Sequence, residues 1–187
     1  MIALITGASS GIGRDIARYL SKLGYDIIIT ARNEEKLVNL KQELDQNNIC
    51  KTDIILADLS KTDECKRLYR QVKEQYGGID LLINNAGFGV FGEFTQTSLN
   101  KELEMIDTNI KAMHILMKLF LKDMTKKNSG KILNVASIAG FMPGPLMGAY
   151  YASKSYIIKI SQAIKEELKK SKSKVTISIL CPRSSKH

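Results

Sequence analysis

The chain has 187 residues, of which 44% are hydrophobic and 25% are charged, a composition typical of one folded domain that buries a substantial core. Its 28 Lys and Arg residues against 19 Asp and Glu residues give a formal net charge of +9, which admits nucleic acid or an anionic small molecule as a ligand. Nucleic acid is disfavoured because the lysines are spread through most predicted helices, and their local run at residues 169–174 contains no aromatic residue for base stacking.

The first predicted element is a strand at residues 2–5, which runs into a glycine-rich turn and a helix at about residues 10–23. Glycines let the backbone turn sharply and approach a ligand, and the helix start presents unpaired N–H groups at its positive end. Together these features predict a pyrophosphate cradle, although the same pattern also occurs in plain connections. The cofactor-binding residues assigned to this turn are Gly7, Ser9, Ser10, Gly11, Ile12 and Gly13.

The second predicted strand is followed by Arg32, where a dinucleotide fingerprint has an acid for the adenosine ribose. Asp26 begins this strand, so it lies at the opposite edge of the sheet. A guanidinium suits a 2′-phosphate because it grips the group through several donors. Arg32 therefore predicts NADP (NADPH) in preference to NAD, and the alternative is an ordinary surface arginine near a helix start.

Polar residues also follow the third and fourth predicted strands. Asp58 comes after the third, and Asn85, Ala86 and Gly87 come after the fourth. Ligands of a doubly wound sheet bind beyond the carboxyl ends of its strands, so we expect these residues to contact the cofactor's adenine or ribose. The alternative roles are a helix cap for Asp58 and turn stabilisation for the asparagine segment.

Strands and helices alternate along the whole chain. Continuous apolar strands joined by helices predict an α/β fold: a Rossmann-type, doubly wound parallel sheet with helices on both faces, in one domain over residues 1–187. The strands are predicted at residues 2–5, 25–30, 52–57, 79–83, 131–136 and 174–180, and the helices at residues 10–23, 33–46, 61–76, 98–126 and 149–170.

The longest predicted helix, residues 98–126, carries apolar side chains at intervals of three or four residues. Such a stripe is far more often part of a core than of a cofactor site, and we expect it to be buried. Its members are Leu99, Leu103, Ile106, Ile110, Met113, Met117, Phe120 and Met124.

The strongest chemical signal lies at the start of the last predicted helix. A tyrosine in water is a poor base at neutral pH, and a nearby cation corrects this by stabilising the phenolate. Tyr150 and Lys154 share a helix face at a spacing of four residues, and Tyr151 also reaches Lys154 at a spacing of three. Spacing alone leaves both tyrosines open, and it also allows two interfacial tyrosines on an amphipathic helix.

Cys50, Cys65 and Cys181 are isolated, with no Cys-x-x-Cys pair, so the sequence predicts neither a disulfide framework nor a metal site. A reducing, cytoplasmic location is the simplest expectation. The apolar run at the N-terminus lacks a basic leader and is too short for a signal peptide, and no stretch is long enough to cross a bilayer. We therefore expect no membrane partner.

Taken in order, these motifs resemble those of the short-chain dehydrogenase/reductase family over nearly the whole chain. The family's Thr-Gly-x-x-x-Gly-x-Gly turn matches residues 6–13, its Asn-Asn-Ala-Gly matches residues 84–87, and its Tyr-x-x-x-Lys matches residues 150–154. The family's catalytic serine matches Ser137, at the end of the fifth predicted strand, and its helix asparagine matches Asn109.

The resemblance implies hydride transfer between a nicotinamide and a carbonyl or alcohol carbon. Tyr150 would exchange the proton, with Tyr151 in a supporting role, and Ser137 would hydrogen-bond the substrate oxygen. Lys154 would stabilise the phenolate and hold the nicotinamide ribose, while Asn109 would position a water in a proton relay. The resemblance further implies that the chain pairs with itself as a homo-oligomer.

The chain departs from the family's pattern after its last predicted strand. The family continues with a glycine, a cofactor-contacting turn, a substrate-covering segment and a final strand, whereas here Pro182 is followed by Arg183 and four further residues. We expect the covering segment and last strand to be absent, Pro182 to contact the cofactor, and turnover to be weak. The leading prediction is an NADP-dependent oxidoreductase acting on a small carbonyl or alcohol substrate, against a non-catalytic dinucleotide-binding or interaction protein and a basic nucleic-acid binder.

Overall fold

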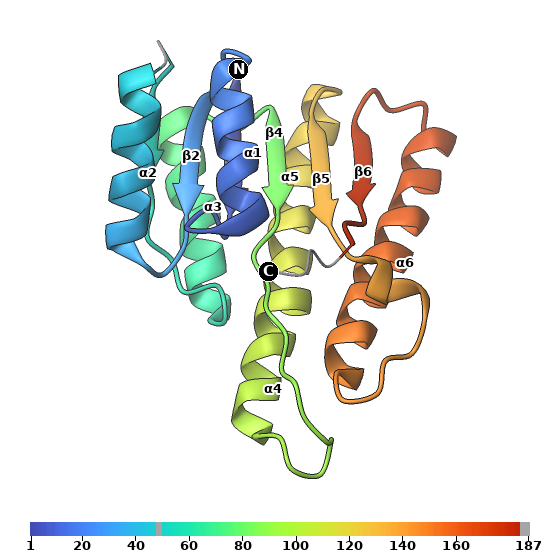
Figure 1. The fold of residues 1–187 in the computed structure, drawn as a ribbon. Helices are drawn as coiled ribbons and strands as arrows, with labels where there is room; N and C mark the ends of the chain where they lie inside the picture. The colour runs from blue at the N-terminus through green and yellow to red at the C-terminus, as the bar shows by residue number, and fades with distance from the viewer. Residues whose placement is uncertain (48–49, 184–187) are drawn as a thin grey trace.

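A computed structural model of the chain describes residues 1–47 and 50–183. Within them, six parallel strands form one sheet in the order β3-β2-β1-β4-β5-β6 (Figure 1). The strand order reverses between β1 and β4, where two crossovers diverge and a doubly wound sheet leaves room for a ligand. This arrangement confirms the predicted fold class. The strands are β1 (Ile2–Thr6), β2 (Asp26–Thr30), β3 (Thr52–Ile54), β4 (Leu81–Asn84), β5 (Lys131–Val135) and β6 (Thr176–Leu180).

Helices cover both faces of the sheet. Helices α1 (Gly11–Lys22) and α2 (Glu34–Asn47) pack on one face, where Ala17 and Leu37 join a core with Ile5 and Ile29. On the other face lie α3 (Thr62–Tyr76), α5 (Met113–Lys127) and α6 (Gly148–Lys170), which bury their apolar sides against alternate residues of the same strands. No helix in the described part of the chain is both long enough and apolar enough to span a membrane.

The third strand is shorter than predicted. It ends at Ile54, whereas the apolar pattern predicted it to Ala57. The backbone still follows β2 beyond this point, because Ile55 N donates to Ile29 O at 3.1 Å and Ala57 N donates to Ala31 O at 3.3 Å. The strand therefore loosens toward the edge at which Asp58 follows.

The long helix predicted from residue 98 is divided by a π-helical turn, Asp107–Ala112, which separates α4 (Leu99–Ile106) from α5. A π-helical turn accommodates an extra residue and rotates the faces of the helix on either side of it. The prediction of one buried stripe is wrong for the first half, since Leu99 is 67% exposed and Leu103 is 49% exposed. It is correct for the second half, where Met117 and Phe120 are buried.

Strand β6 pairs only with β5 in the described sheet, so it lies at an edge. Ile177 faces α6 and is buried, whereas Leu180 is exposed on the opposite face. The sheet face covered by α1 and α2 is thus open over β6. Residues 184–187, which the sequence analysis placed after this strand, lie outside the described residues.

Candidate cofactor and catalytic site

A cavity of about 500 Å³ opens beyond the carboxyl ends of the strands, at the reversal of strand order. Thirteen of the fourteen predicted cofactor residues line it: Gly7, Ser9, Ser10, Gly11, Ile12, Arg32, Asp58, Asn85, Ala86, Gly87, Tyr150, Lys154 and Pro182. The sequence analysis missed eight others: Ala31, Asn33, Ala57, Leu59, Phe88, Thr108, Val135 and Ala136. Most of these adjoin predicted residues, so extending each motif by one position finds them. Thr108 enters from the π-helical turn, next to the predicted Asn109, and Val135 is the one that adjoins no predicted site residue.

The glycine turn has the geometry of an anion cradle. Gly7 and Gly11 have φ values of 65° and 53°, a left-handed conformation that side chains disfavour. Helix α1 begins after Ser10 with no side-chain cap and no acidic residue in its first turn. Its first N–H groups and its positive end therefore face the cavity without an internal anion, which suits a pyrophosphate.

Gly13 lies behind the cradle instead of lining it. A Cβ atom at this position would lie 2.4 Å from both Asn85 Nδ2 and Gly7 O. The Asn85 amide already donates to Thr6 O at 3.0 Å and to Gly7 O at 3.1 Å, which ties the turn after β4 to the turn after β1. Gly13 is thus needed for close packing of α1, and its link to a cofactor is indirect.

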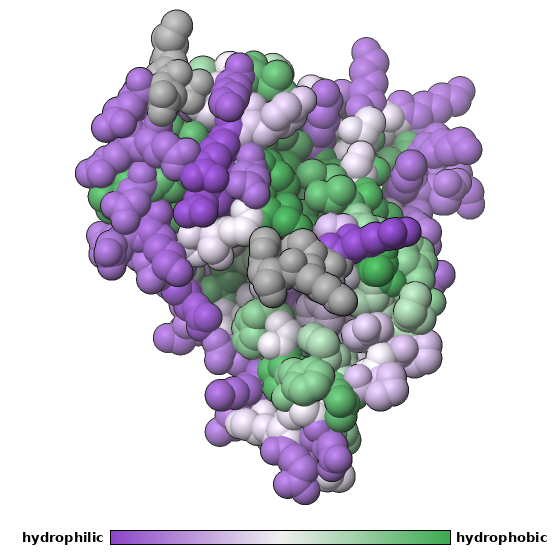
Figure 2. Space-filling view, viewed as in Figure 1, coloured by the Kyte–Doolittle hydropathy of each residue, from purple (hydrophilic) through white to green (hydrophobic). Residues whose placement is uncertain are grey.

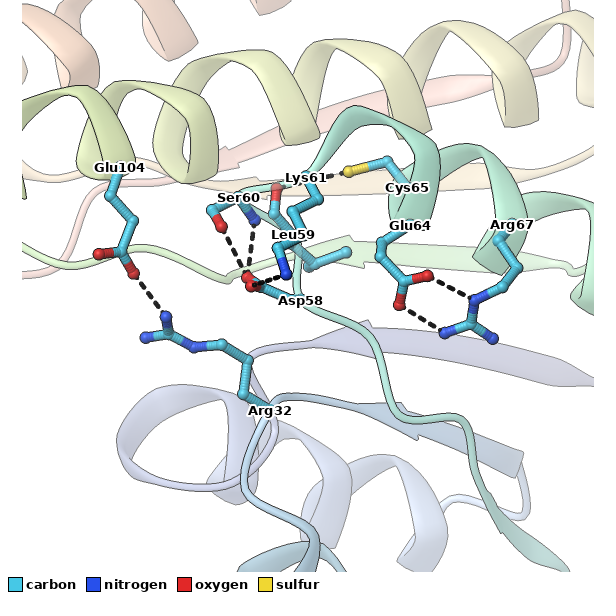
Figure 3. Close-up of polar contacts among 9 residues, drawn as sticks. All are labelled: Arg32, Asp58, Leu59, Ser60, Lys61, Glu64, Cys65, Arg67 and Glu104. Atoms are coloured by element: carbon cyan, nitrogen blue, oxygen red, sulfur yellow. Dashed lines mark hydrogen bonds and ion pairs between the residues drawn. The ribbon is translucent and has the colours of Figure 1, made fainter. Parts of the chain in front are cut away.

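Arg32, which follows β2, and Asp58 both line the cavity, and Figure 3 shows their polar contacts. The Arg32 side chain is 59% exposed, and its Nη1 atom lies 2.5 Å from Glu104 Oε1 of α4. Asp58 accepts hydrogen bonds from Ser60 Oγ at 2.7 Å and Ser60 N at 3.2 Å. Burial raises the pKa of Asp58, but the Ser60 hydrogen bonds and the charges of Arg32 and Lys61 outweigh it and hold the pKa below its ordinary value.

The structure separates the two tyrosines that spacing left open. Lys154 Nζ lies 5.6 Å from the centroid of the Tyr150 ring, and Tyr150 lines the cavity. The Tyr151 ring instead packs on Gly144, where a Cβ atom would lie 2.3 to 2.5 Å from its atoms. Tyr150 is therefore the tyrosine at the cavity, next to the cation.

Lys154 is a buried cation, with 5% of its surface exposed. Its ammonium group donates to Val135 O, at the end of β5, over 3.0 Å. Burial lowers its pKa from 10.5 to about 8, because the charged form loses hydration. The ammonium also lies close to Gly87, since a Cβ atom there would be 3.6 Å from Nζ. Lys154 is thus positioned between the ends of β4 and β5.

Ser137 directly follows the lining residue Ala136 and is nearly buried. Its Oγ atom accepts a hydrogen bond from Ala139 N at 3.1 Å, which caps the short 3-10 turn Ile138–Phe141. Within the described part of the chain, the hydroxyl hydrogen has no acceptor. It can therefore be donated to a substrate oxygen.

Asn109 holds the loop after β4 in place. Its amide oxygen accepts from Phe88 N at 3.0 Å, and its amide nitrogen donates to Phe88 O at 2.9 Å and to Ser153 Oγ at 3.1 Å. The side chain is fully buried within the π-helical turn. Asn109 therefore links this loop to α6, and its role in a proton relay stays a prediction.

Two uncharged segments meet at Tyr150. Residues 86–92 and 137–151, the second of which runs into α6 and includes Tyr150, contain no Asp, Glu, Lys or Arg. A 2.9 Å hydrogen bond from Gly92 N to Leu146 O joins them. Phe91 and Phe141 on these segments are 73% and 64% exposed. Figure 2 shows apolar side chains above and below the middle of this face, with hydrophilic side chains at its margins. The two segments therefore give Tyr150 an uncharged surrounding.

Comparison with known sequences identifies close relatives. The family model described as short chain dehydrogenase matches residues 1–186. An uncharacterised oxidoreductase of Staphylococcus saprophyticus is 34% identical over 175 residues, which cover 94% of this chain and 75% of that protein. An uncharacterised oxidoreductase of Staphylococcus epidermidis is 35% identical, over 94% of this chain and 74% of that protein.

Solved structures are similar over almost the entire chain. A metagenomic short-chain oxidoreductase in complex with NADP has a TM-score of 0.91 at 33% identity, over 99% of this chain and 83% of that one. A short-chain dehydrogenase from Sphingobium yanoikuyae in complex with NADPH has a TM-score of 0.92 at 29% identity, over 99% and 71%. One from Burkholderia phymatum in complex with NAD has a TM-score of 0.91 at 29% identity, over 97% and 65%.

Proposed function

The chain belongs to the short-chain dehydrogenase family and is a dehydrogenase or reductase of that type, so its cofactor is a nicotinamide dinucleotide. From this premise we propose that it is NADP-dependent and transfers a hydride between the nicotinamide and a carbonyl or alcohol carbon, using Ser137, Tyr150 and Lys154. The observation that carries the proposal is the buried Lys154 ammonium beside the Tyr150 ring, in the wall of the cavity that also holds the glycine cradle.

Each side chain has a defined part in the reaction. The bound cofactor supplies or accepts the hydride. During reduction, Tyr150 donates its hydroxyl proton to the substrate oxygen, and the nearby Lys154 cation stabilises the phenolate that remains. Ser137 donates its hydroxyl hydrogen to the same oxygen, where negative charge develops. Lys154 also holds the nicotinamide ribose, and Asn109 keeps the loop after β4 against α6.

The uncharged segments around Tyr150 support an uncharged substrate. A charged substrate group would lose its hydration among the apolar side chains of residues 86–92 and 137–151 without gaining an ionic partner there. Hydrophobic ketones and aldehydes, or the corresponding alcohols, suit this environment. A solved structure similar to this chain, an alcohol dehydrogenase from Comamonas testosteroni, is described as specific for bulky-bulky ketones.

The test compares Tyr150→Phe with Tyr151→Phe, using oxidation of NADPH with a panel of uncharged ketones and aldehydes. We expect Tyr150→Phe to lower turnover by about 10²- to 10⁴-fold, because the transferable proton is lost, while NADPH affinity stays nearly unchanged. Tyr151→Phe is the matched control and should have a mild effect. The reverse result would contradict the assignment of Tyr150. NADPH binding without turnover of any substrate by the parent chain would favour a non-catalytic dinucleotide-binding protein.

Preference for NADP rests on Arg32, which follows β2 and lines the cavity. The parent chain should bind NADPH more tightly than NADH, and Arg32→Asp should reverse this order, since an acid repels the 2′-phosphate and accepts from a ribose hydroxyl. Calorimetric titration of both reduced cofactors measures these affinities. Equal affinities in the parent chain would contradict the preference.

We also propose a homo-oligomer in a reducing, cytoplasmic location. The exposed side chains of Leu99, Leu103 and Ile106 form one stripe on α4 that a second copy could cover. All three cysteines are free, which suits a reducing compartment. Light scattering tests the association, and a monomer at high protein concentration would contradict it.

A further inference from the structure

Glu104 contacts the arginine on which the proposed cofactor preference depends. Arg32 follows β2, and Glu104 lies 72 residues away on α4, yet Figure 3 shows the two side chains extending toward each other. We infer that Glu104 is a specificity-determining residue that acts through Arg32: it occupies the guanidinium that the 2′-phosphate needs and so weakens NADP binding relative to NAD binding. This inference rests on the proposed function.

Of the two carboxylates near Arg32, Glu104 is the one that competes with the phosphate. Asp58 is a second carboxylate near Arg32, but it already accepts hydrogen bonds from Ser60 and lies 3.7 Å from Lys61 Nζ. Glu104 has Arg32 as its ion-pair partner among the described residues. When Arg32 turns to a phosphate, Glu104 is left without a partner beside a new anion, and this repulsion weakens binding.

The effect should be selective for the phosphorylated cofactor. NAD carries a neutral 2′-hydroxyl group, which needs no guanidinium. Within the described part of the chain, Arg32 lines the cavity whereas Glu104 does not. Glu104 should therefore have little contact with the adenosine itself, so removing its charge should leave NADH binding unchanged.

The size of the effect follows from the exposure of the pair. The side chains of Arg32 and Glu104 are 59% and 38% exposed, and exposed ion pairs are weak. We expect Glu104→Gln to lower the Kd of NADPH by about two- to fivefold. Because salt screens exposed charges, the change should shrink at about 0.5 M salt.

The experiment measures the Kd of NADPH and of NADH by isothermal titration calorimetry for the parent chain and two variants. Glu104→Gln keeps the shape of the side chain and removes its charge. Glu166→Gln, at an exposed position late in α6, is the control for the same change in net charge. We expect tighter NADPH binding only in Glu104→Gln, with NADH affinity unchanged in both variants.

A double-mutant cycle separates competition for Arg32 from a structural effect. In an Arg32→Gln background, Glu104→Gln should no longer change NADPH affinity, because the contact that it relieves is gone. An effect that persists in this background would overturn the inference, as would an equal effect on both cofactors or none on either. Weaker NADH binding in Glu104→Gln would also overturn it, by making Glu104 a ribose ligand. A parent chain that binds neither cofactor would instead overturn the proposed function and this inference with it.

Discussion

Lys154 is a buried cation whose removal should stabilise the fold. The pKa of an exposed lysine is 10.5, whereas the pKa of Lys154 in the folded chain is about 8, because burial penalises the charged form. That difference corresponds to about 3 kcal/mol. At pH 7 the folded protein therefore carries most of this cost, since Lys154 is protonated in both the folded and the unfolded state.

The informative variant is Lys154→Met, which keeps a long side chain and removes the charge. It also removes the hydrogen bond to Val135 O, which costs about 1 kcal/mol. The expected net gain at pH 7 is about 1 to 2 kcal/mol in the free energy of unfolding, or a rise of about 2 to 8 °C in Tm for a domain of this size. Cofactor binding should weaken and turnover should be lost, as is common when a functional charge is replaced.

The pH dependence of the gain in stability tests whether burial of the Lys154 charge is its cause. Between about pH 8 and 10.5 the unfolded chain binds more protons at Lys154 than the folded chain, so the stability of the parent protein rises with pH. Lys154→Met should thus have its full gain in stability over the parent protein below pH 8 and no such gain above pH 10.5. Thermal and urea unfolding across this range measure it. Lys159→Met, at an exposed position on the same helix, is the control and should change little. Equal destabilisation by Lys154→Met at every pH would refute the reasoning.

Three further predictions concern packing and polar contacts. Gly13→Ala should lower the free energy of unfolding by about 1 to 3 kcal/mol and weaken cofactor binding, because the new Cβ atom would meet the Asn85 amide. An unchanged Tm and an unchanged affinity would contradict this prediction. Asn109→Ala should lower the free energy of unfolding by about 2 to 4 kcal/mol. It should also increase hydrogen exchange at the Phe88 amide, because the Asn109 side chain bonds both backbone groups of Phe88. Unchanged exchange would exclude that role. Burial raises the pKa of Asp123, but hydrogen bonds from a lysine and a tyrosine outweigh it and keep the pKa low. Asp123→Asn should therefore lower the free energy of unfolding by about 1 kcal/mol at pH 7, and by less as the pH falls through the folded-state pKa, below 3.8. A loss that is independent of pH would contradict the assignment.

The fold and most of the cavity wall could be predicted because their signals are local. Apolar runs and glycine turns mark strands and their ends, and a parallel sheet brings those ends to one edge. This reasoning located Gly7, Asp58 and Asn85 at the cavity before any contact was known. Spacing could not decide between Tyr150 and Tyr151, since the packing of Tyr151 on Gly144 is set by tertiary structure. Only the Tyr-x-x-x-Lys motif of the family favoured Tyr150.

Two features of the structure could not be predicted from local sequence patterns. The π-helical turn depends on contacts of Asn109 with Phe88 and Ser153, which lie 21 and 44 residues away, so periodicity alone predicted an unbroken helix. The pair between Arg32 and Glu104 likewise joins two elements, since the residues lie 72 positions apart, after β2 and on α4. Sequence patterns predicted the arginine and its suitability for a phosphate, but an arginine that is already paired is a weaker phosphate ligand than one that is free.

Several residues that destabilise the fold lie around one cavity. Their roles help to decide whether the chain is an enzyme or a protein that only binds a dinucleotide. Gly7 and Gly11 lose more conformational freedom on folding than other residues would, and Lys154 buries a charge. A pyrophosphate at the cradle accounts for the glycines in either protein. A ribose contact accounts for Lys154 in either protein, but it does not need a tyrosine beside the cation, whereas proton transfer needs both groups. Comparing Lys154→Met with Tyr150→Phe distinguishes the two. Lys154→Met should weaken NADPH binding in either protein, whereas only an oxidoreductase has a turnover that Tyr150→Phe removes while NADPH affinity stays nearly unchanged.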